Sequence, residues 1–281
     1  MTVDIPRLRL ADGARVPALG QGTWTMGEQS RKRGEEVAAL NLGLDLGMTL
    51  IDTAEMYGDG GAEEIVGAAI AGRRSQVFLV SKVYPQNAGG KRAIDACERS
   101  LKRLRTDHLD LYLLHWRGRI PLAETVDAFE RLRRDGKILR WGVSNFDVAD
   151  LKGLLKLPEG ARCATNQVLY HLGERGIEWE LVKLMRAHAM PLMAYSPLGQ
   201  GDLLRNPKLS PIARRLKCTP AQVALAWLLR KRDVMAIPQS SNPAHVHDNR
   251  GAILIDLDEE ALHALDRAFP PPSRATPLAV I

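Results

Sequence analysis

The sequence of 281 residues has few cysteines and no long apolar run. Cys97, Cys163 and Cys218 stand singly, which supports neither a disulfide framework nor a paired-thiol zinc site, so we expect small buried side chains. No segment is long enough to cross a bilayer, and the N-terminal MTVDIPRLRL lacks an apolar core of signal-peptide length. We therefore expect a cytoplasmic protein with no membrane partner.

Aromatic residues make up only 5% of the chain, and its net charge of +6 comes from basic residues dispersed among acids, as in KRLRTDHLD and ERLRRDGK. A nucleic-acid surface would combine a basic stripe with stacking rings. The dispersed pattern is more typical of solvated helix faces, so we expect no nucleic-acid partner. Anionic small ligands are compatible with this charge.

Several signatures of other folds and functions are also missing. Residues 20–25, GQGTWT, lack the last glycine of the dinucleotide fingerprint found in doubly wound sheets, and there is no P-loop. No His-x-His pair or carboxylate cluster follows a predicted strand, so we expect no metal site. No linker or low-complexity stretch divides the chain, which favours one domain over residues 1–281 and, with it, a monomer.

The chain does contain a regular alternation of short apolar runs with segments of helical period. An N-terminal β-hairpin is predicted first, with strands 8–10 and 16–18 around the turn Asp12-Gly13. Helices such as 91–104 and 221–231 then separate eight strands. Eight such units predict an α/β fold, a single parallel (β/α)₈ TIM barrel. The predicted strands are 19–22, 50–52, 77–82, 109–115, 138–144, 164–167, 191–195 and 234–237.

Polar side chains end nearly all of these strands. Asp52, Lys82 and His115 close three apolar runs in succession. The C-terminal strand ends of a (β/α)₈ barrel form one rim, where active-site groups collect, so we expect these side chains to lie together. Later strands end in Ser144-Asn145, Asn166-Gln167 and Tyr195-Ser196.

Tyr57 follows Asp52 in a glycine-rich turn, where its phenol is a candidate proton donor. A phenol with an ordinary pKa of about 10 needs a nearby cation to be a useful acid. Lys82 would supply that cation, with Asp52 to orient it, and so lower the pKa of the phenol. Taken alone, the Asp52 and Lys82 pair is more typical of a structural ion pair. A neutral His115 on the next strand, able to hydrogen-bond a carbonyl oxygen, favours a carbonyl-protonating site.

These motifs resemble the aldo-keto reductase superfamily over most of the chain. LIDTAEMYG carries the aspartate and tyrosine of its catalytic tetrad as Asp52 and Tyr57, VSK its lysine as Lys82, and LLHW its histidine as His115. The segments HWRG, WGVSNF, NQVLYH and AYSPLGQG look like bacterial reductases that act on 2-keto aldehydes and diketo sugar acids.

The resemblance implies an NADP(H)-dependent reduction of a small aldehyde or ketone, with a proton from Tyr57. Cofactor roles transfer to Ser144, Asn145, Gln167, Tyr195, Ser196, Leu198, Gly199, Gln239, Ser240, His245 and Asn249. The substrate pocket would be walled by Trp24, Met56, Tyr84 and Trp116. Methylglyoxal is the expected type of substrate, with Arg117 beside the pocket.

The segment that would hold the 2′-phosphate departs from the family, and the C-terminal tail limits what the resemblance implies about the substrate. Where relatives usually carry lysine and arginine against the 2′-phosphate, this chain has Gln239 and His245, so we expect some use of NAD(H) as well, with Arg250 helping to hold the phosphate. The tail PPSRATPLAVI predicts a small loop and an open pocket. The alternative function is a nicotinamide-binding regulatory or redox-sensing subunit on the same barrel.

Overall fold

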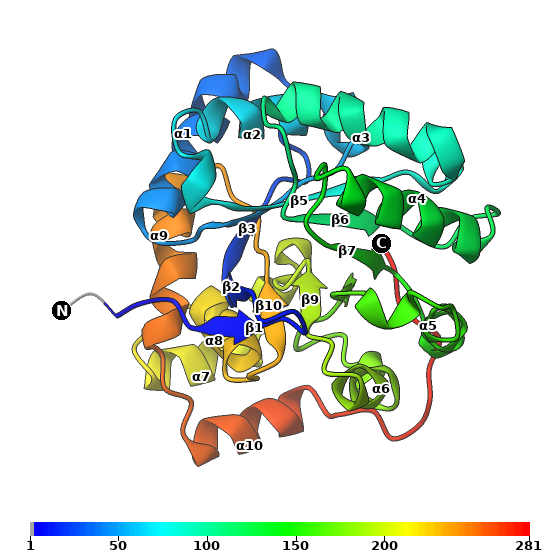
Figure 1. Cartoon of the computed structure of the whole chain (residues 1–281). Coiled ribbons are helices and arrows are strands. Elements are labelled where there is room, and N and C mark those ends of the chain that lie inside the picture. Colours follow the sequence, from blue (N-terminus) through cyan, green and yellow to red (C-terminus); the bar gives the residue numbers. More distant parts are fainter. Residues whose placement is uncertain (1–2) are drawn as a thin grey trace.

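The structure, a computed structural model, describes residues 3–281 and is built around eight parallel strands (Figure 1). Each strand pairs with the next along the chain, and bridges from Leu19 to Ala236 and from Gly22 to Gln239 join the first of them to the last. The predicted (β/α)₈ barrel is therefore confirmed. Its strands are β3 (Gly20–Gly22), β4 (Leu50–Asp52), β5 (Phe78–Val83), β6 (Leu111–Leu114), β7 (Trp141–Ser144), β8 (Asn166–Leu169), β9 (Leu192–Tyr195) and β10 (Val234–Ala236).

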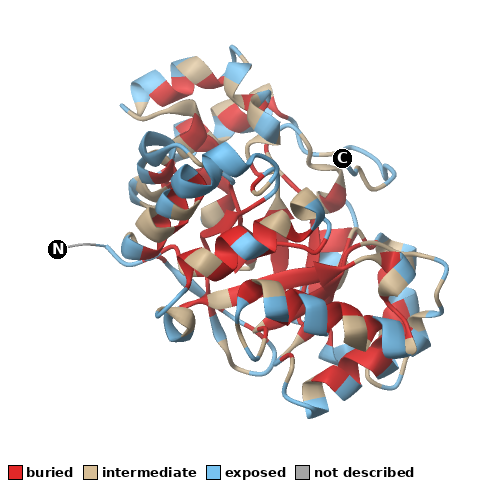
Figure 2. Cartoon of the chain, turned by 90° about the horizontal axis from the view of Figure 1, so that it is seen from above, coloured by how far each residue is buried: buried red, intermediate tan, exposed pale blue. Residues whose placement is uncertain are grey.

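Helices surround the barrel, and buried residues concentrate in its strands and on the inward faces of the helices (Figure 2). Helix α8 starts at a capping box, in which Thr219 and Gln222 bond each other's backbone N–H groups. The helices are α1 (Arg33–Asp45), α2 (Gly61–Ala69), α3 (Gly90–Leu104), α4 (Leu122–Arg134), α5 (Val148–Leu155), α6 (Leu181–Ala187), α7 (Leu209–Arg215), α8 (Pro220–Leu229), α9 (Pro243–Gly251) and α10 (Glu259–Ala268).

The predicted hairpin is present as β1 (Arg7–Arg9) and β2 (Arg15–Pro17), one residue earlier than expected. Its apolar side chains pack into one end of the barrel, against residues near the start of the strands. The hairpin therefore covers the N-terminal end of the barrel and leaves the other end for polar side chains. This cluster contains Leu8, Leu10, Val16 and Ala18 from the hairpin and Leu50, Val80, Leu111, Met193 and Met235 from the barrel.

The C-terminal ends of four predicted strands need correction. Strand β6 ends at Leu114 and β10 at Ala236, each one residue earlier than expected, so His115 follows β6. Asn166 and Gln167 begin β8 instead of ending it, because Val168 and Leu169 continue the ladder with β9. The buried amide of Asn166 is satisfied by the backbone of Phe146, which explains how a polar residue is tolerated there. Lys82 is followed by one more strand residue.

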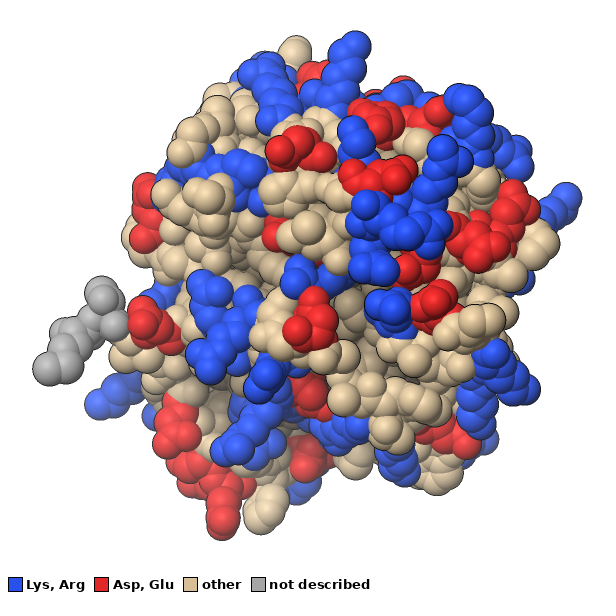
Figure 3. Space-filling view, in the orientation of Figure 1, with Lys and Arg blue, Asp and Glu red and all other residues tan. Residues whose placement is uncertain are grey.

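Basic and acidic side chains are interspersed on the face of the molecule seen in Figure 3. Of the cysteines, Cys97 and Cys163 are buried as expected, but Cys218 is partly exposed, and all three are free thiols. Within residues 3–281, no helix combines the length and the apolar character that a membrane span requires.

Candidate active site

The four predicted tetrad residues lie together at the C-terminal end of the barrel. Lys82 has no exposed surface, and its ammonium donates to Asp52 Oδ2 over 2.6 Å, to the Thr53 carbonyl over 2.9 Å and to the Tyr57 hydroxyl over 3.1 Å. An ammonium has three N–H groups, and each has a partner here. Because Lys82 is the donor to Tyr57, the phenol keeps its own O–H free to donate to another group.

The loop that carries Tyr57 depends on glycine. Tyr57 begins a short 3-10 turn, Tyr57–Gly60, in which Gly58 and Gly60 have positive φ angles of 57° and 90°. A Cβ atom on Gly60 would also lie 2.7 Å from the side chain of Arg103. The turn therefore requires glycine at this position, both for conformation and for space.

The electrostatics of this cluster differ in one respect from the sequence prediction. Burial raises the pKa of Tyr57 above its usual 10.0, Lys82 lowers it, and Asp52 raises it again, so the net direction is upward. The expected net lowering of the Tyr57 pKa is thus wrong, although Lys82 does act in the expected direction. Burial lowers the pKa of Lys82, but Asp52 and Tyr57 outweigh this and raise it above 10.5. Tyr57 is therefore a neutral phenol, and Lys82 an ammonium, at neutral pH.

His115 follows β6 and packs edge-on against Tyr57, with 5.8 Å between the ring centroids. Burial, helped by the charge of Lys82, lowers the pKa of His115 to about 2, so the ring is neutral. Its Nδ1 atom is buried and has no hydrogen-bond partner among residues 3–281. Buried N–H groups are left unpaired less often than buried acceptors, which favours the tautomer with its proton on Nε2.

A cavity of about 290 Å³ opens above the tetrad. Three predicted wall residues, Trp24, Met56 and Trp116, line it, but Tyr84 does not. The Tyr84 ring packs edge-on against Trp116 at 5.9 Å and so supports the wall from behind. The cavity is lined by Gly22, Thr23, Trp24, Asp52, Met56, Tyr57, His115, Trp116, Ser144, Asn145, Gln167, Tyr195, Ser196, Ile237, Gln239 and Ile281.

The predicted nicotinamide contacts Ser144, Asn145, Gln167 and Tyr195 line the same cavity. The Tyr195 hydroxyl donates to Asn145 Oδ1 over 2.9 Å, and Ser144 Oγ donates to the Gln167 carbonyl over the same distance. Asn145 and Ser196 both have positive φ angles, 57° and 43°. Strained backbone of this kind is concentrated at ligand-binding sites.

A second cavity, of about 450 Å³, continues from the first and shares Trp24, Ser196 and Gln239 with it. The predicted residues Leu198, His245 and Asn249 also line this cavity, whereas Gly199 and Ser240 do not. Together the two cavities fit an elongated ligand with a ring at one end and a nucleotide at the other, as a nicotinamide dinucleotide has.

Two residues that were expected to contact the cofactor phosphate, Ser240 and Arg250, make other hydrogen bonds near α9. The Ser240 hydroxyl donates to the Asn242 carbonyl and accepts from its N–H group. The Arg250 guanidinium donates to the carbonyls of Leu46 and Val3, so the expected help from Arg250 is not supported. Sequence reasoning missed Thr219 and Asp248, which line this cavity with 2.7 Å between hydroxyl and carboxylate. Thr219 has only the sequence signal of a helix cap, and Asp248 lies within α9 and has none.

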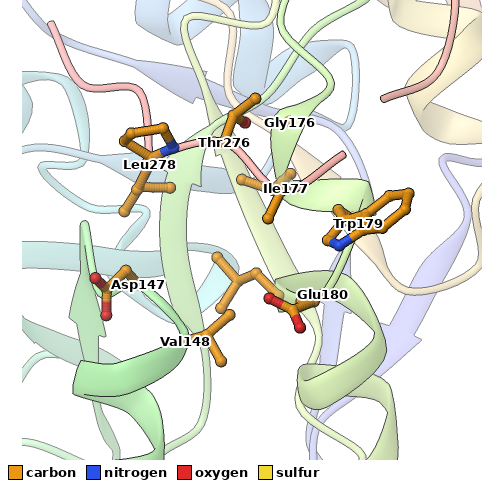
Figure 4. A pocket seen from close by; sticks show the side chains of 11 residues that line it. Asp147, Val148, Gly176, Ile177, Trp179, Glu180, Thr276 and Leu278 are labelled. Carbon is orange, nitrogen blue, oxygen red and sulfur yellow. The ribbon is translucent and has the colours of Figure 1, made fainter. Parts of the chain in front are cut away.

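The C-terminal tail, which was expected to be a small loop beside an open pocket, is an irregular segment that reaches the pocket. Residues 275–278 pack over Ile177, Trp179 and the start of α5, with Thr276 beside Gly176 and Leu278 above a small pocket (Figure 4). Beyond this contact, Ile281 lines the cavity above the tetrad. The tail therefore forms part of the cavity wall.

Comparison with known proteins decides which family this geometry represents. The model of the aldo/keto reductase family matches residues 18–269. This chain belongs to that family. Methylglyoxal reductase YeaE of Escherichia coli is 53% identical over 98% of each chain. Glyoxal reductase of Bacillus subtilis is 36% identical over 92% of this chain and 91% of its own.

Solved structures of family members agree. A crystal structure of an aldo/keto reductase from Klebsiella pneumoniae, in complex with NADP and acetate, is 51% identical and covers 99% of this chain and 100% of its own, with a TM-score of 0.96. A second structure from the same organism, in complex with NADPH, has the same identity, coverage and TM-score. The predicted enzyme class, an aldo-keto reductase that reduces carbonyl groups with NADP(H), is therefore confirmed. Nothing in these comparisons favours a regulatory subunit.

In the described part of this aldo/keto reductase, no three His, Cys, Asp or Glu side chains lie in an arrangement that could hold a metal ion.

Proposed function

We propose that this aldo/keto reductase reduces small, uncharged 2-oxo aldehydes such as methylglyoxal, with NADPH as the preferred hydride donor. The observation that carries the proposal is the hydrogen bond from Lys82 to the Tyr57 oxygen, 3.1 Å long, beside the cavity. It leaves the phenol proton available to a carbonyl oxygen in that cavity.

The tetrad residues would have separate roles. Bound NADPH supplies a hydride to the carbonyl carbon, and the carbonyl oxygen takes the Tyr57 proton. Lys82 stabilises the phenolate that Tyr57 becomes, since the ammonium lies against the oxygen that gains the negative charge. Asp52 holds Lys82 in place, and neutral His115 donates from Nε2 to the same carbonyl oxygen and so orients it.

The lining of the cavity supports an uncharged substrate. Trp24, Met56, Trp116 and Ile237 give it apolar walls, and no lysine or arginine is found among its lining residues within the described part of the chain. Arg117, expected beside the pocket, instead donates to the Gly118 and Ile120 carbonyls. A keto acid would therefore lose solvation of its carboxylate without gaining an ion pair. The two named relatives reduce methylglyoxal and glyoxal, which also supports a small dicarbonyl substrate.

The cofactor would lie along both cavities, with its nicotinamide against Tyr195 and its carboxamide near Ser144, Asn145 and Gln167. The NADP and NADPH complexes of the Klebsiella proteins support NADP(H). Gln239, which lines both cavities, is a neutral amide where relatives usually have a cation, and this supports measurable use of NADH as well. We also propose that residues 1–281 form one domain and that the protein is a cytoplasmic monomer.

A panel of substrates tests this function. Consumption of NADPH would be followed with methylglyoxal, glyoxal, pyruvate and a long-chain aldehyde, each at several concentrations. We expect the highest kcat/KM with methylglyoxal or glyoxal and at least about tenfold less with pyruvate, since about 1.4 kcal/mol of lost binding corresponds to a factor of ten. A preference for pyruvate or for the long-chain aldehyde would contradict the proposed substrate class.

A further inference from the structure

The catalytic carboxylate has a second partner from the far side of the barrel. Gln167 Nε2, in β8, donates to Asp52 Oδ1 over 2.7 Å, while Lys82 donates to Oδ2 over 2.6 Å. Three strands separate β8 from β4 in the sheet, so this contact crosses the barrel interior. Asp52 and Gln167 are 2% and 1% exposed, and water therefore cannot replace either partner at little cost.

We propose that Gln167 is a positioning residue for the tetrad, whose amide holds the Asp52 carboxylate in the orientation that pairs with Lys82. This role is additional to any contact of Gln167 with the cofactor. It rests on the proposed function, because the orientation of Lys82 matters for catalysis only if Tyr57 donates the proton.

The orientation of the Gln167 amide follows from its partner. An ionised carboxylate only accepts hydrogen bonds, so the NH₂ group must face Asp52 and the amide oxygen must face elsewhere. The same nitrogen lies 2.8 Å from the sulfur of Met193 on β9, and Ser144 Oγ donates to the backbone carbonyl of Gln167. These contacts hold Gln167 at the cavity wall with one end of its amide committed to Asp52.

The charged and titratable groups near Asp52 explain why this neutral donor matters. Lys82 from β5 contacts one carboxylate oxygen, Tyr57 from the loop after β4 contacts Lys82, and His115 after β6 is neutral. Burial raises the pKa of Asp52, and Lys82 and Gln167 both lower it. Without Gln167, Oδ1 would lose its donor, the carboxylate would be free to rotate away from Lys82, and its charged form would be less stable.

The first test measures the carboxyl group itself in the cofactor-free protein. Gln167→Met keeps the approximate length of the side chain and removes the donor. The pKa of Asp52 would be followed by carbon-13 NMR of labelled aspartate carboxyls, with the signal assigned from its loss in Asp52→Asn. We expect the pKa to rise by about one unit, the size of a lost hydrogen bond to a buried carboxylate. Met56→Leu, which alters the same cavity at a residue that contacts neither Asp52 nor Gln167 through a hydrogen bond, should leave it unchanged. An unchanged Asp52 pKa in folded Gln167→Met would overturn the proposal.

A second variant covers the case in which Gln167→Met does not fold. Gln167→Glu would place two carboxyl groups in contact, and such a pair holds one shared proton until the pH is high. While the proton is shared, the new group can still donate to Asp52, so kcat/KM should be highest at low pH and fall by about tenfold or more as the proton is lost. A profile parallel to that of the unchanged enzyme would overturn the proposal.

Two further measurements distinguish a failure of the positioning role from a failure of the proposed function. NADPH affinity, followed by protein fluorescence, shows whether either variant acts only through the cofactor; a loss of affinity with an unchanged kcat and an unchanged Asp52 pKa would overturn the positioning role. Activity of Tyr57→Phe decides the proposed function independently, because that variant leaves the contact between Gln167 and Asp52 intact.

Discussion

Lys82 donates to the oxygen of Tyr57 over 3.1 Å while none of the lysine surface is exposed to solvent. The ammonium therefore lies where a phenolate charge would develop, and its other two N–H groups are held by Asp52 and Thr53. The phenol is a weak acid here, because burial raises its pKa more than Lys82 lowers it. In the proposed mechanism Lys82 would stabilise the phenolate as it forms, and the neutral ground state suits reduction.

Replacement of Lys82 by methionine should lower kcat for carbonyl reduction by about 10²-fold to 10⁴-fold, the usual contribution of general acid catalysis. It also leaves Asp52 as a buried, unpaired carboxylate, which costs about 3–5 kcal/mol of folding free energy. The double variant Asp52→Asn with Lys82→Met is the matched control. It should recover much of the stability, measured by urea denaturation, without recovering activity. Recovery of activity together with stability would show that Lys82 is only structural.

The rate of reduction should not change in the pH range where a histidine of ordinary pKa titrates. The pKa of His115 is lowered to about 2 and that of Tyr57 is raised above 10.0, so both stay in the form that donates a hydrogen bond or a proton. We expect kcat/KM with NADPH to stay level between about pH 6 and pH 9 and to fall only as Tyr57 ionises at higher pH. A decline centred near the ordinary histidine pKa of about 6.5, absent from a His115→Gln variant, would contradict a neutral His115.

His115 should matter most for small substrates, which have few other contacts to orient them. We expect His115→Gln to lower kcat/KM for methylglyoxal by about tenfold to a hundredfold and to affect a bulky aromatic aldehyde less. The comparison requires both substrates with both forms of the enzyme. If their ranking and rates did not change, the orienting role of His115 would have to be abandoned.

The neutral side chain of Gln239 in the cofactor site predicts only a modest preference for NADPH over NADH. Gln239 lines both cavities as a neutral amide, so Gln239→Lys should raise the ratio of kcat/KM with NADPH to that with NADH by about tenfold through a charge-assisted contact. The control is Leu254→Lys, which adds the same charge at an exposed residue that lines neither cavity and should leave the ratio unchanged. A strong NADPH preference that Gln239→Lys leaves unchanged would show that other residues hold the 2′-phosphate.

The barrel and the tetrad were predictable because each depends on a local pattern. Lys82 and His115 are single polar residues at the ends of apolar runs, and such residues in buried strands have few positions other than the rim of a barrel. The ends of β8 were not predictable in this way, because the register with β9 carries the strand past Gln167 into Val168 and Leu169. A polar residue within a strand gives no local signal of where that strand stops.

The remaining errors concern contacts between segments that are distant in the sequence. The bond between Gln167 and Asp52 joins residues 115 positions apart, and Ile281 reaches the cavity only because the tail packs over α5 and α6. Tyr84 was misplaced for the same reason, since its packing on Trp116 depends on how two loops meet. The upward shift in the pKa of Tyr57 depends on burial, which spacing along the chain does not report.

Tyr57→Phe with methylglyoxal and NADPH tests the central claim most directly, because it removes the proton donor and keeps the ring. The measurement is kcat/KM for the reduction beside the NADPH dissociation constant from fluorescence titration. The account predicts a loss of kcat/KM of about 10²-fold or more with an NADPH affinity within about twofold of the original. Near-normal turnover by the phenylalanine variant would contradict the account.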